Sequence, residues 1–134
     1  ETAVSLKGLH ILLAEDNEVN MEIVTELLTA QDVHVTQAWN GKEAVERFEE
    51  AEPFFFDAVL MDMQMPVLDG CGAARKIRAL DRPDAQIVPM IAVTANAFAE
   101  DIAATTAAGM NAHISKPIDF KALQKTLVQL LWRK

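Results

Sequence analysis

The sequence predicts an α/β fold, a doubly wound sandwich in which helices cover both faces of a parallel β-sheet. Short continuous apolar runs of strand length alternate five times with longer segments whose apolar residues recur at helical spacing. Continuous apolar runs are typical of parallel strands that are buried on both faces. The chain has 134 residues, 51% of them hydrophobic and 24% charged, which is the size and composition of one compact domain.

The first part of the chain supplies two strand–helix units. Leu9–Ala14 predicts a buried strand, and Asn17–Ala30 predicts a helix with apolar residues along one side. Those apolar residues are Val19, Ile23, Val24, Leu27 and Leu28. Val33–Ala38 predicts the second strand, and Lys42–Ala51, which follows an Asn-Gly turn, predicts the second helix.

Three further units follow in the same order. Asp57–Met61 predicts the third strand, and the Gly-rich and Pro-containing stretch Gln64–Gly72 predicts a loop leading into a helix that ends near Leu80. The last two strands are expected at Val88–Val93 and Ala112–Ser115, and the last two helices at Ala97–Ala108 and Asp119–Leu131. Because crossovers between parallel strands are right-handed, the expected architecture is a flavodoxin-like (βα)₅ sheet in the order 2-1-3-4-5.

The expected domain spans residues 9–131, with residues 1–8 as an N-terminal extension or linker remnant and 132–134 as a short tail. The start at Glu1 without Met suggests a piece of a longer protein.

Charge and composition exclude several classes of function. The formal net charge of −8 repels a phosphate backbone, so direct binding to nucleic acid is not expected. No apolar stretch approaches the ~20 residues of a membrane span, so no membrane contact by this domain is expected. The single cysteine, Cys71, excludes an internal disulfide and favours a reducing, cytoplasmic location, with a membrane-bound parent protein left open.

Polar side chains follow the predicted strands at the points where the apolar runs end. Glu15 and Asp16 come directly after the first strand, and Asp62 ends the third. Thr94 ends the fourth strand and Lys116 ends the fifth. Because ligands of such sheets bind beyond the carboxyl ends of the strands, at the topological switch point, we expect these five side chains to line one crevice.

The chemistry of this set indicates metal-assisted transfer of a phosphoryl group. Carboxylates that lie close together repel one another unless a cation lies among them. The set offers only oxygen ligands and leaves room for water and phosphate oxygens, which favours Mg²⁺. Lys116 and Thr94 would stabilise the charge on a transferring phosphoryl group, and Asp62 is the expected nucleophile.

Each residue taken alone has a plainer explanation. Glu15 and Asp16 precede a helix and could stabilise its N-terminus, and Thr94 could cap the next helix. Lys116 alone would be an ordinary solvated side chain. The joint placement at one edge of one sheet favours the functional interpretation.

The motifs at these positions resemble the receiver domain of two-component response regulators over about residues 8–131. The matching runs are Leu13-Ala14-Glu15-Asp16-Asn17, Leu60-Met61-Asp62-Met63-Gln64-Met65-Pro66, Asp69-Gly70, Ala92-Val93-Thr94-Ala95 and Lys116-Pro117. Within the family, Asp-Asn-Glu-Val-Asn at 16–20 and Met-Gln-Met-Pro at 63–66 look most like receivers of hybrid sensor histidine kinases.

The resemblance implies a metal site in which Asp16 holds Mg²⁺ directly and Glu15 partly through water. Asp62 and the backbone carbonyl of Gln64 would complete the protein ligands, and Asp62 would accept the phosphoryl group. No other cofactor is implied.

The resemblance also assigns roles at the last two strands. Thr94 would hydrogen-bond a phosphoryl oxygen, and Lys116 would pair with Asp62 or the phosphate, next to a cis bond to Pro117. The family's switch position, usually Tyr or Phe, is His113 here. A histidine that packs near the sheet edge and a rotamer switch that follows Thr94 both remain open.

The implied partners are a histidine kinase, a histidine phosphotransfer domain, or both. Such partners would dock against the first helix, at Asn17, Val19, Asn20 and Ile23, and against the loop around Pro117. The expected function is Mg²⁺-dependent transfer of a phosphoryl group from phosphohistidine to Asp62, with a conformational switch. The domain would catalyse its own phosphorylation and dephosphorylation without being a turnover enzyme alone.

Three alternatives compete with this function. A degenerate receiver could act as a phosphorylation-independent interaction module, which the intact set of five residues disfavours. A haloacid-dehalogenase-type phosphatase would need a second aspartate where Gln64 stands, to act as general acid and base. A flavin binder would need a Ser, Thr and Gly-rich phosphate loop after the first strand, where the acidic run Glu15–Glu18 stands instead.

Overall fold

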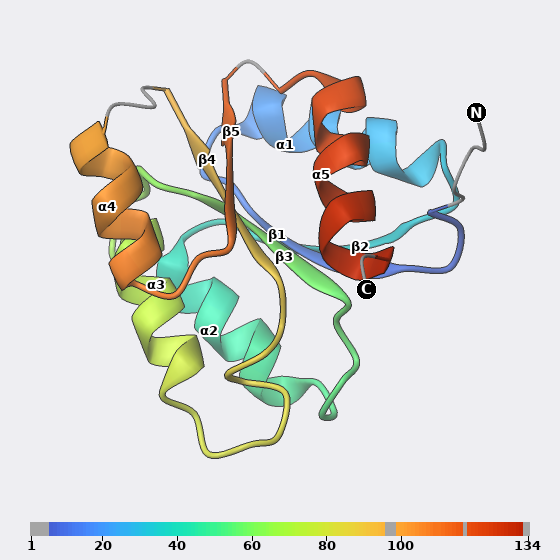
Figure 1. Cartoon of the computed structure of the whole chain (residues 1–134). Coiled ribbons are helices and arrows are strands. Elements are labelled where there is room, and N and C mark those ends of the chain that lie inside the picture. Colours follow the sequence, from blue (N-terminus) through green and yellow to red (C-terminus); the bar gives the residue numbers. More distant parts are fainter. Residues whose placement is uncertain (1–5, 96–98, 117, 133–134) are drawn as a thin grey trace.

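The computed structural model describes residues 6–95, 99–116 and 118–132, within which five strands alternate with five helices (Figure 1). The strands are β1 (His10–Ala14), β2 (His34–Ala38), β3 (Ala58–Asp62), β4 (Met90–Thr94) and β5 (Ala112–Ser115). The helices are α1 (Glu18–Thr29), α2 (Gly41–Glu50), α3 (Gly70–Arg78), α4 (Ala99–Ala107) and α5 (Phe120–Trp132). All neighbouring strands are parallel, in the order β2-β1-β3-β4-β5, so the predicted fold and strand order are confirmed.

The helices form two layers. Helices α1 and α5 lie on one face of the sheet, and α2, α3 and α4 lie on the other (Figure 1). Alternate residues of the central strands enter two separate apolar clusters, with Leu12 and Val59 on the α2 and α3 side and Ile11 and Leu60 on the α1 and α5 side. Burial on both faces explains why the strands read as continuous apolar runs.

Side-chain caps fix the starts of the helices that flank the candidate site. The Asn17 side chain accepts a hydrogen bond from the backbone N–H of Asn20 at the start of α1. The Asp69 side chain accepts one from the N–H of Gly72 at the start of α3. Such caps satisfy backbone donors that the first helical turn leaves unpaired. The end of α4 has the Gly109 predicted from sequence, with φ of 102° and the hydrogen bonds of a Schellman motif.

The buried side of α1 differs from the prediction. Val19 is 62% exposed and Ile23 is 50% exposed, whereas Met21, Val24 and Leu28 are the buried residues of this helix. The apolar stripe of α1 is wider than the face that the sheet and α5 cover. Val19 and Ile23 are therefore left on the surface at the end of α1 nearest the candidate site.

Strand β4 begins at Met90 rather than at Val88, because the Val88 N–H donates to the Asp84 carbonyl in the preceding turn. The predicted helix start at Ala97 and the residue Pro117 lie outside the described residues, and so does the expected cis bond.

The segment before β1 contributes to packing, since Leu6 is 2% exposed and belongs to the cluster under α1 and α5. The division into residues 1–8, 9–131 and 132–134 stays a prediction. In the part of the chain that the structure describes, no helix has the length and apolar character needed to cross a membrane.

Candidate functional site

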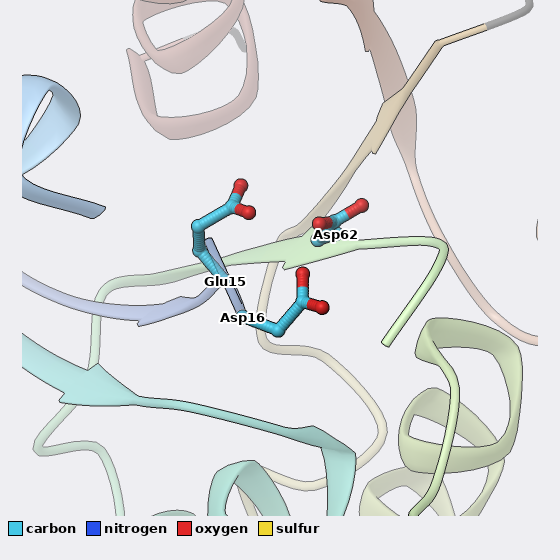
Figure 2. A group of neighbouring side chains, drawn as sticks. All are labelled: Glu15, Asp16 and Asp62. Atoms are coloured by element: carbon cyan, nitrogen blue, oxygen red, sulfur yellow. The ribbon is translucent and has the colours of Figure 1, made fainter. Parts of the chain in front are cut away.

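Three carboxylates gather where β1 and β3 end. Ligand oxygens of Glu15, Asp16 and Asp62 all lie within 4.8 Å of one another, around one shared space (Figure 2). Glu15 and Asp62 are buried, at 3% and 2% exposure, whereas Asp16 is exposed. The sheet thus brings together the acidic residues that the sequence predicted to be neighbours, and Asp16 keeps the cluster in contact with solvent.

Lys116 is the cation of this cluster. Its Nζ donates a hydrogen bond to Asp62 Oδ2 at 3.0 Å and lies 3.8 Å from Glu15 Oε1. Its backbone N–H donates to the Thr94 carbonyl at 2.8 Å, which ties the end of β5 to the end of β4. The predicted contact between Lys116 and Asp62 is present, and the approach to Glu15 is an addition that the sequence did not suggest.

Asp62 is held from both sides. Its Oδ2 accepts a hydrogen bond from Lys116 Nζ, and its Oδ1 accepts one from the backbone N–H of Gln64 at 3.1 Å. A Cβ on Gly70 would lie 2.5 Å from the Asp62 carbonyl oxygen, so glycine allows α3 to start directly against the end of β3. The carbonyl of Gln64 as a metal ligand stays a prediction, and so does the action of Thr94, 8% exposed at the end of β4, on a phosphoryl oxygen.

The Glu15 carboxyl has an unusual environment. Burial raises its pKa from 4.5 to about 7, and the negative charge of Asp62 adds to the rise. The hydrogen bond from the Asn17 N–H to Glu15 Oε2, at 3.0 Å, and the nearby Lys116 cation oppose it. Ionised Glu15 therefore destabilises the fold unless more positive charge reaches the cluster.

The simple capping explanation does not account for the acidic pair. Asn17 is the residue that caps α1, while Glu15 accepts from the Asn17 N–H ahead of the helix and shares the cluster with Asp62. Three oxygen donors in close reach, two of them buried, fit a hard divalent cation such as Mg²⁺, which uses few carboxylates and keeps waters.

The loop from β3 to α3 carries backbone strain. Val67 has φ of 70° and is 76% exposed, and the Leu68 N–H donates to the Pro66 carbonyl across it at 2.7 Å. This bond and the positive φ describe a γ-turn of the strained type, which is rare for a β-branched residue. The Gly41 N–H donates to the Leu68 carbonyl at 2.9 Å and fastens the loop to α2.

His113 is half-buried on β5, and its Nε2 contacts the hydroxyl oxygen of Thr105 on α4. The sequence identified His113 but not Thr105, because Thr105 has no motif around it and becomes notable only when α4 lies against β5. The position is therefore a packed histidine with a specific polar partner, and its action as a switch stays a prediction.

Comparison with known proteins identifies relatives of this arrangement. Residues 11–128 match the family model described as response regulator receiver domain. The chain is 36% identical over 128 residues to the signal transduction histidine-protein kinase BarA of Escherichia coli, covering 96% of the chain but only 13% of that kinase.

Two solved structures are similar in fold and sequence. One is the receiver domain of the sensor histidine kinase PA1611 from Pseudomonas aeruginosa, with magnesium in its active-site cleft; it is 39% identical with a TM-score of 0.84, over 94% of this chain and 99% of that one. The other is the Saccharomyces cerevisiae complex of the phosphotransfer protein Ypd1 with the receiver domain of Ssk1, at 28% identity and a TM-score of 0.83, over 96% and 92%.

Proposed function

Because the chain belongs to the response regulator receiver family, we propose that it accepts a phosphoryl group from phosphohistidine on Asp62, in a two-component phosphorelay. One observation carries the proposal: the Asp62 carboxylate lies in a cluster with Glu15 and Asp16, and its Oδ2 accepts a hydrogen bond from Lys116 Nζ at 3.0 Å. A carboxylate nucleophile, acidic metal ligands and a cation for the phosphoryl charge are thus neighbours.

Asp62, Lys116 and Thr94 would each have a separate role in the transfer of the phosphoryl group. A carboxylate oxygen of Asp62 would attack phosphorus, forming an O–P bond as the P–N bond of phosphohistidine breaks and its electron pair returns to the imidazole. Lys116, already bonded to Asp62, would stay beside the new acyl phosphate and stabilise its negative charge. The Thr94 hydroxyl would donate a hydrogen bond to a phosphoryl oxygen. The pairing of β3 with β4, which brings the ends of the two strands together, supports this role.

Glu15, Asp16, Asp62 and the Gln64 carbonyl are the proposed Mg²⁺ ligands. Mg²⁺ bound there would offset the charge of the carboxylates and of the incoming phosphoryl group. Support comes from the oxygen-only donor set and from the magnesium in the PA1611 receiver cleft. Lys116 alone leaves two of the three carboxylate charges without an opposite charge, so the chain's own residues favour a divalent cation.

The proposed partner is a phosphohistidine-bearing helical domain of a histidine kinase or phosphotransfer protein. The exposed side chains of Val19 and Ile23 lie on α1, and Ile23 lines a small cavity of about 80 Å³ together with Glu15 and Lys116. An apolar surface beside the acceptor suits the apolar face of a partner helix. The receiver in the Ypd1 complex has the same fold, which supports this choice. The cytoplasmic location favoured by the single cysteine belongs to the proposal as well.

Phosphorylation of the isolated chain tests the function. Incubation with acetyl phosphate and Mg²⁺ should give an acid-stable, base-labile mass gain of one phosphoryl group, and chelation of Mg²⁺ should prevent it. Asp62→Asn should abolish the adduct while the fold is kept. The matched control is Asp57→Asn at the opposite end of β3, which keeps an oxygen for the His10 N–H and should be labelled normally.

Labelling that persists in Asp62→Asn would refute the assignment of the acceptor. A wild-type chain that binds Mg²⁺ and a histidine phosphotransfer partner but gives no adduct would instead favour the interaction module.

A further inference from the structure

Two histidines lie side by side at the end of the sheet opposite to the acidic cluster. His10 begins β1 and His34 begins β2, and the two residues are direct partners in the register of the parallel strands. Successive side chains of a strand point to opposite faces of the sheet, so residues that are paired in register point to the same face. The two imidazole rings are accordingly neighbours, with centroids 4.7 Å apart and planes 17° from parallel.

Hydrogen bonds between strands fix the backbone from which both side chains start. The His34 N–H donates to the Leu9 carbonyl at 2.8 Å. The His10 N–H donates to Asp57 Oδ2 at 2.9 Å, and the His10 carbonyl accepts a hydrogen bond from the Asp57 N–H at 2.7 Å. The Phe55 ring also packs against the His10 ring, with centroids 4.4 Å apart. The two imidazoles are therefore presented by ordered strands rather than by a loop.

Neither imidazole makes a polar contact with another described residue. His34 is exposed and His10 is half-buried, and among residues 6–95, 99–116 and 118–132 no hydrogen bond or ion pair engages a ring nitrogen of either. His113, the third histidine of the chain, differs because its Nε2 contacts the Thr105 hydroxyl. A neutral imidazole has one unprotonated nitrogen, and this is the nitrogen that binds a metal ion. His10 and His34 thus offer two such nitrogens at the surface.

The spacing of the two rings fits imidazoles that share one metal ion. A tetrahedral Zn²⁺ binds imidazole nitrogen at about 2.0–2.1 Å, which places the centroids of two ligating rings about 5 Å apart. The observed separation of 4.7 Å is close to that value. Because a metal ion lies in the plane of each ligating ring, the rings must leave the stacked arrangement by rotating about χ2, a torsion with broad minima in histidine. The exposure of His34 leaves room for this rotation.

We propose that His10 and His34 together bind one divalent transition-metal ion, Zn²⁺ or an ion of similar chemistry, with water as the remaining ligands. Imidazole nitrogen suits Zn²⁺, Cu²⁺ and Ni²⁺, whereas Mg²⁺ prefers oxygen, so this ion differs from the one proposed for the acidic cluster. Among the described residues the two histidines belong to no group of three or more metal-ligating side chains, so the protein supplies two ligands and binding needs both. The ion would tie the edge strand β2 to β1. The inference does not rest on the function proposed for Asp62.

Calorimetric titration of the whole chain with Zn²⁺, with Mg²⁺ in excess to compete for the acidic cluster, tests the site. Wild type should bind one ion at the histidine pair. His10→Phe and His34→Phe each keep a planar ring for the stack and remove the nitrogen ligand. Loss of an outer-shell partner already weakens metal binding by roughly 10- to 100-fold, so each variant should bind Zn²⁺ at least about tenfold more weakly. His113→Phe, the same change at the third histidine, should bind like wild type. Equal Zn²⁺ affinity in wild type and His34→Phe would overturn the site.

Nuclear magnetic resonance locates the ion. With Mg²⁺ in excess, paramagnetic Ni²⁺ should broaden the signals at the amino ends of β1 and β2 before that of His113, and His34→Phe should lose this broadening. Because His34 is exposed on the edge strand, His34→Phe should keep the fold, which its amide spectrum checks. Zn²⁺ should raise the midpoint of thermal unfolding of wild type and of His113→Phe, but not of the other two variants. Broadening at the acidic cluster alone, or the same thermal shift in all four proteins, would overturn the proposal.

Discussion

Replacing Glu15 with glutamine should stabilise the metal-free protein while weakening Mg²⁺ binding at the proposed site. The Glu15 carboxyl is 3% exposed, faces Asp62 in the acidic cluster, and has its pKa raised to about 7, mainly by burial. Glutamine has nearly the same shape and keeps an oxygen for the Asn17 N–H, but it carries no charge. The variant therefore removes the destabilising ionisation and leaves the packing intact.

The size and pH window of the effect follow from linkage. The pKa of Glu15 is about 7 in the folded protein, compared with the ordinary value of 4.5 in the unfolded chain, so the folded state binds the proton more tightly. The stability from this proton is fully present below pH 4.5 and is lost as pH rises through 7. A rise of this size corresponds to roughly 3 kcal/mol, which Glu15→Gln should recover above neutral pH.

Urea unfolding in excess chelator, from about pH 5 to about pH 8, measures this difference. The gain of Glu15→Gln over wild type should grow across the range and level off above neutral pH. Glu18→Gln changes an exposed residue in the first turn of α1, and its free energy of unfolding relative to wild type should not change across this pH range. With Mg²⁺ in excess, wild type should gain stability and Glu15→Gln should gain less.

A difference between Glu15→Gln and wild type that stays constant between about pH 5 and about pH 8 would refute this reasoning, because only titration of Glu15 gives it a slope. A wild type whose stability is the same with and without Mg²⁺ would contradict the role of the cluster as a cation site.

Two further predictions concern the loop from β3 to α3. Val67→Gly should raise the free energy of unfolding by about 1 kcal/mol, because it relieves the positive φ of 70° at a β-branched residue, whereas Val67→Ala, which keeps a Cβ, should bring no such gain in urea unfolding. Gly41→Ala should destabilise the fold by about 3 kcal/mol or more and slow the phosphorylation of Asp62, since its Cβ would lie 2.0 Å from the Leu68 carbonyl oxygen. Gly72→Ala should be much milder in the same assays because the nearest atom, 2.6 Å away, is the movable Cδ1 of Leu68; equal losses in the two alanine variants would contradict this distinction.

The sequence predicted the architecture and the acidic cluster because both depend on local signals. Continuous apolar runs identified the strands, and the polar residue at the end of each run marked the carboxyl edge where the site lies. Asp62 and Lys116 are 54 positions apart in the chain, yet the rule that parallel strands end at one edge was enough to place them together.

Other features could not be predicted, because they depend on distances between elements. The apolar stripe of α1 gave no sign that Val19 and Ile23 would stay exposed while Met21 is buried. The raised pKa of Glu15 depends on how deeply its carboxyl is buried, and the residues beside it come from separate parts of the chain, α1 and the segment after β5. Thr105 has no motif of its own, so its contact with His113 emerges only from the placement of α4.

The acidic cluster lies at the ends of the neighbouring strands β1 and β3, whereas Val19 and Ile23 lie exposed on helix α1. Under the proposed function, reactivity and partner choice therefore depend on different elements, the ends of two strands and the exposed side chains of one helix. Exchanging Val19 and Ile23 should change which histidine kinase phosphorylates the domain without altering the phosphorylation of Asp62 itself. A cell with many such domains could then vary which kinase each domain responds to, while every domain keeps the same acidic cluster.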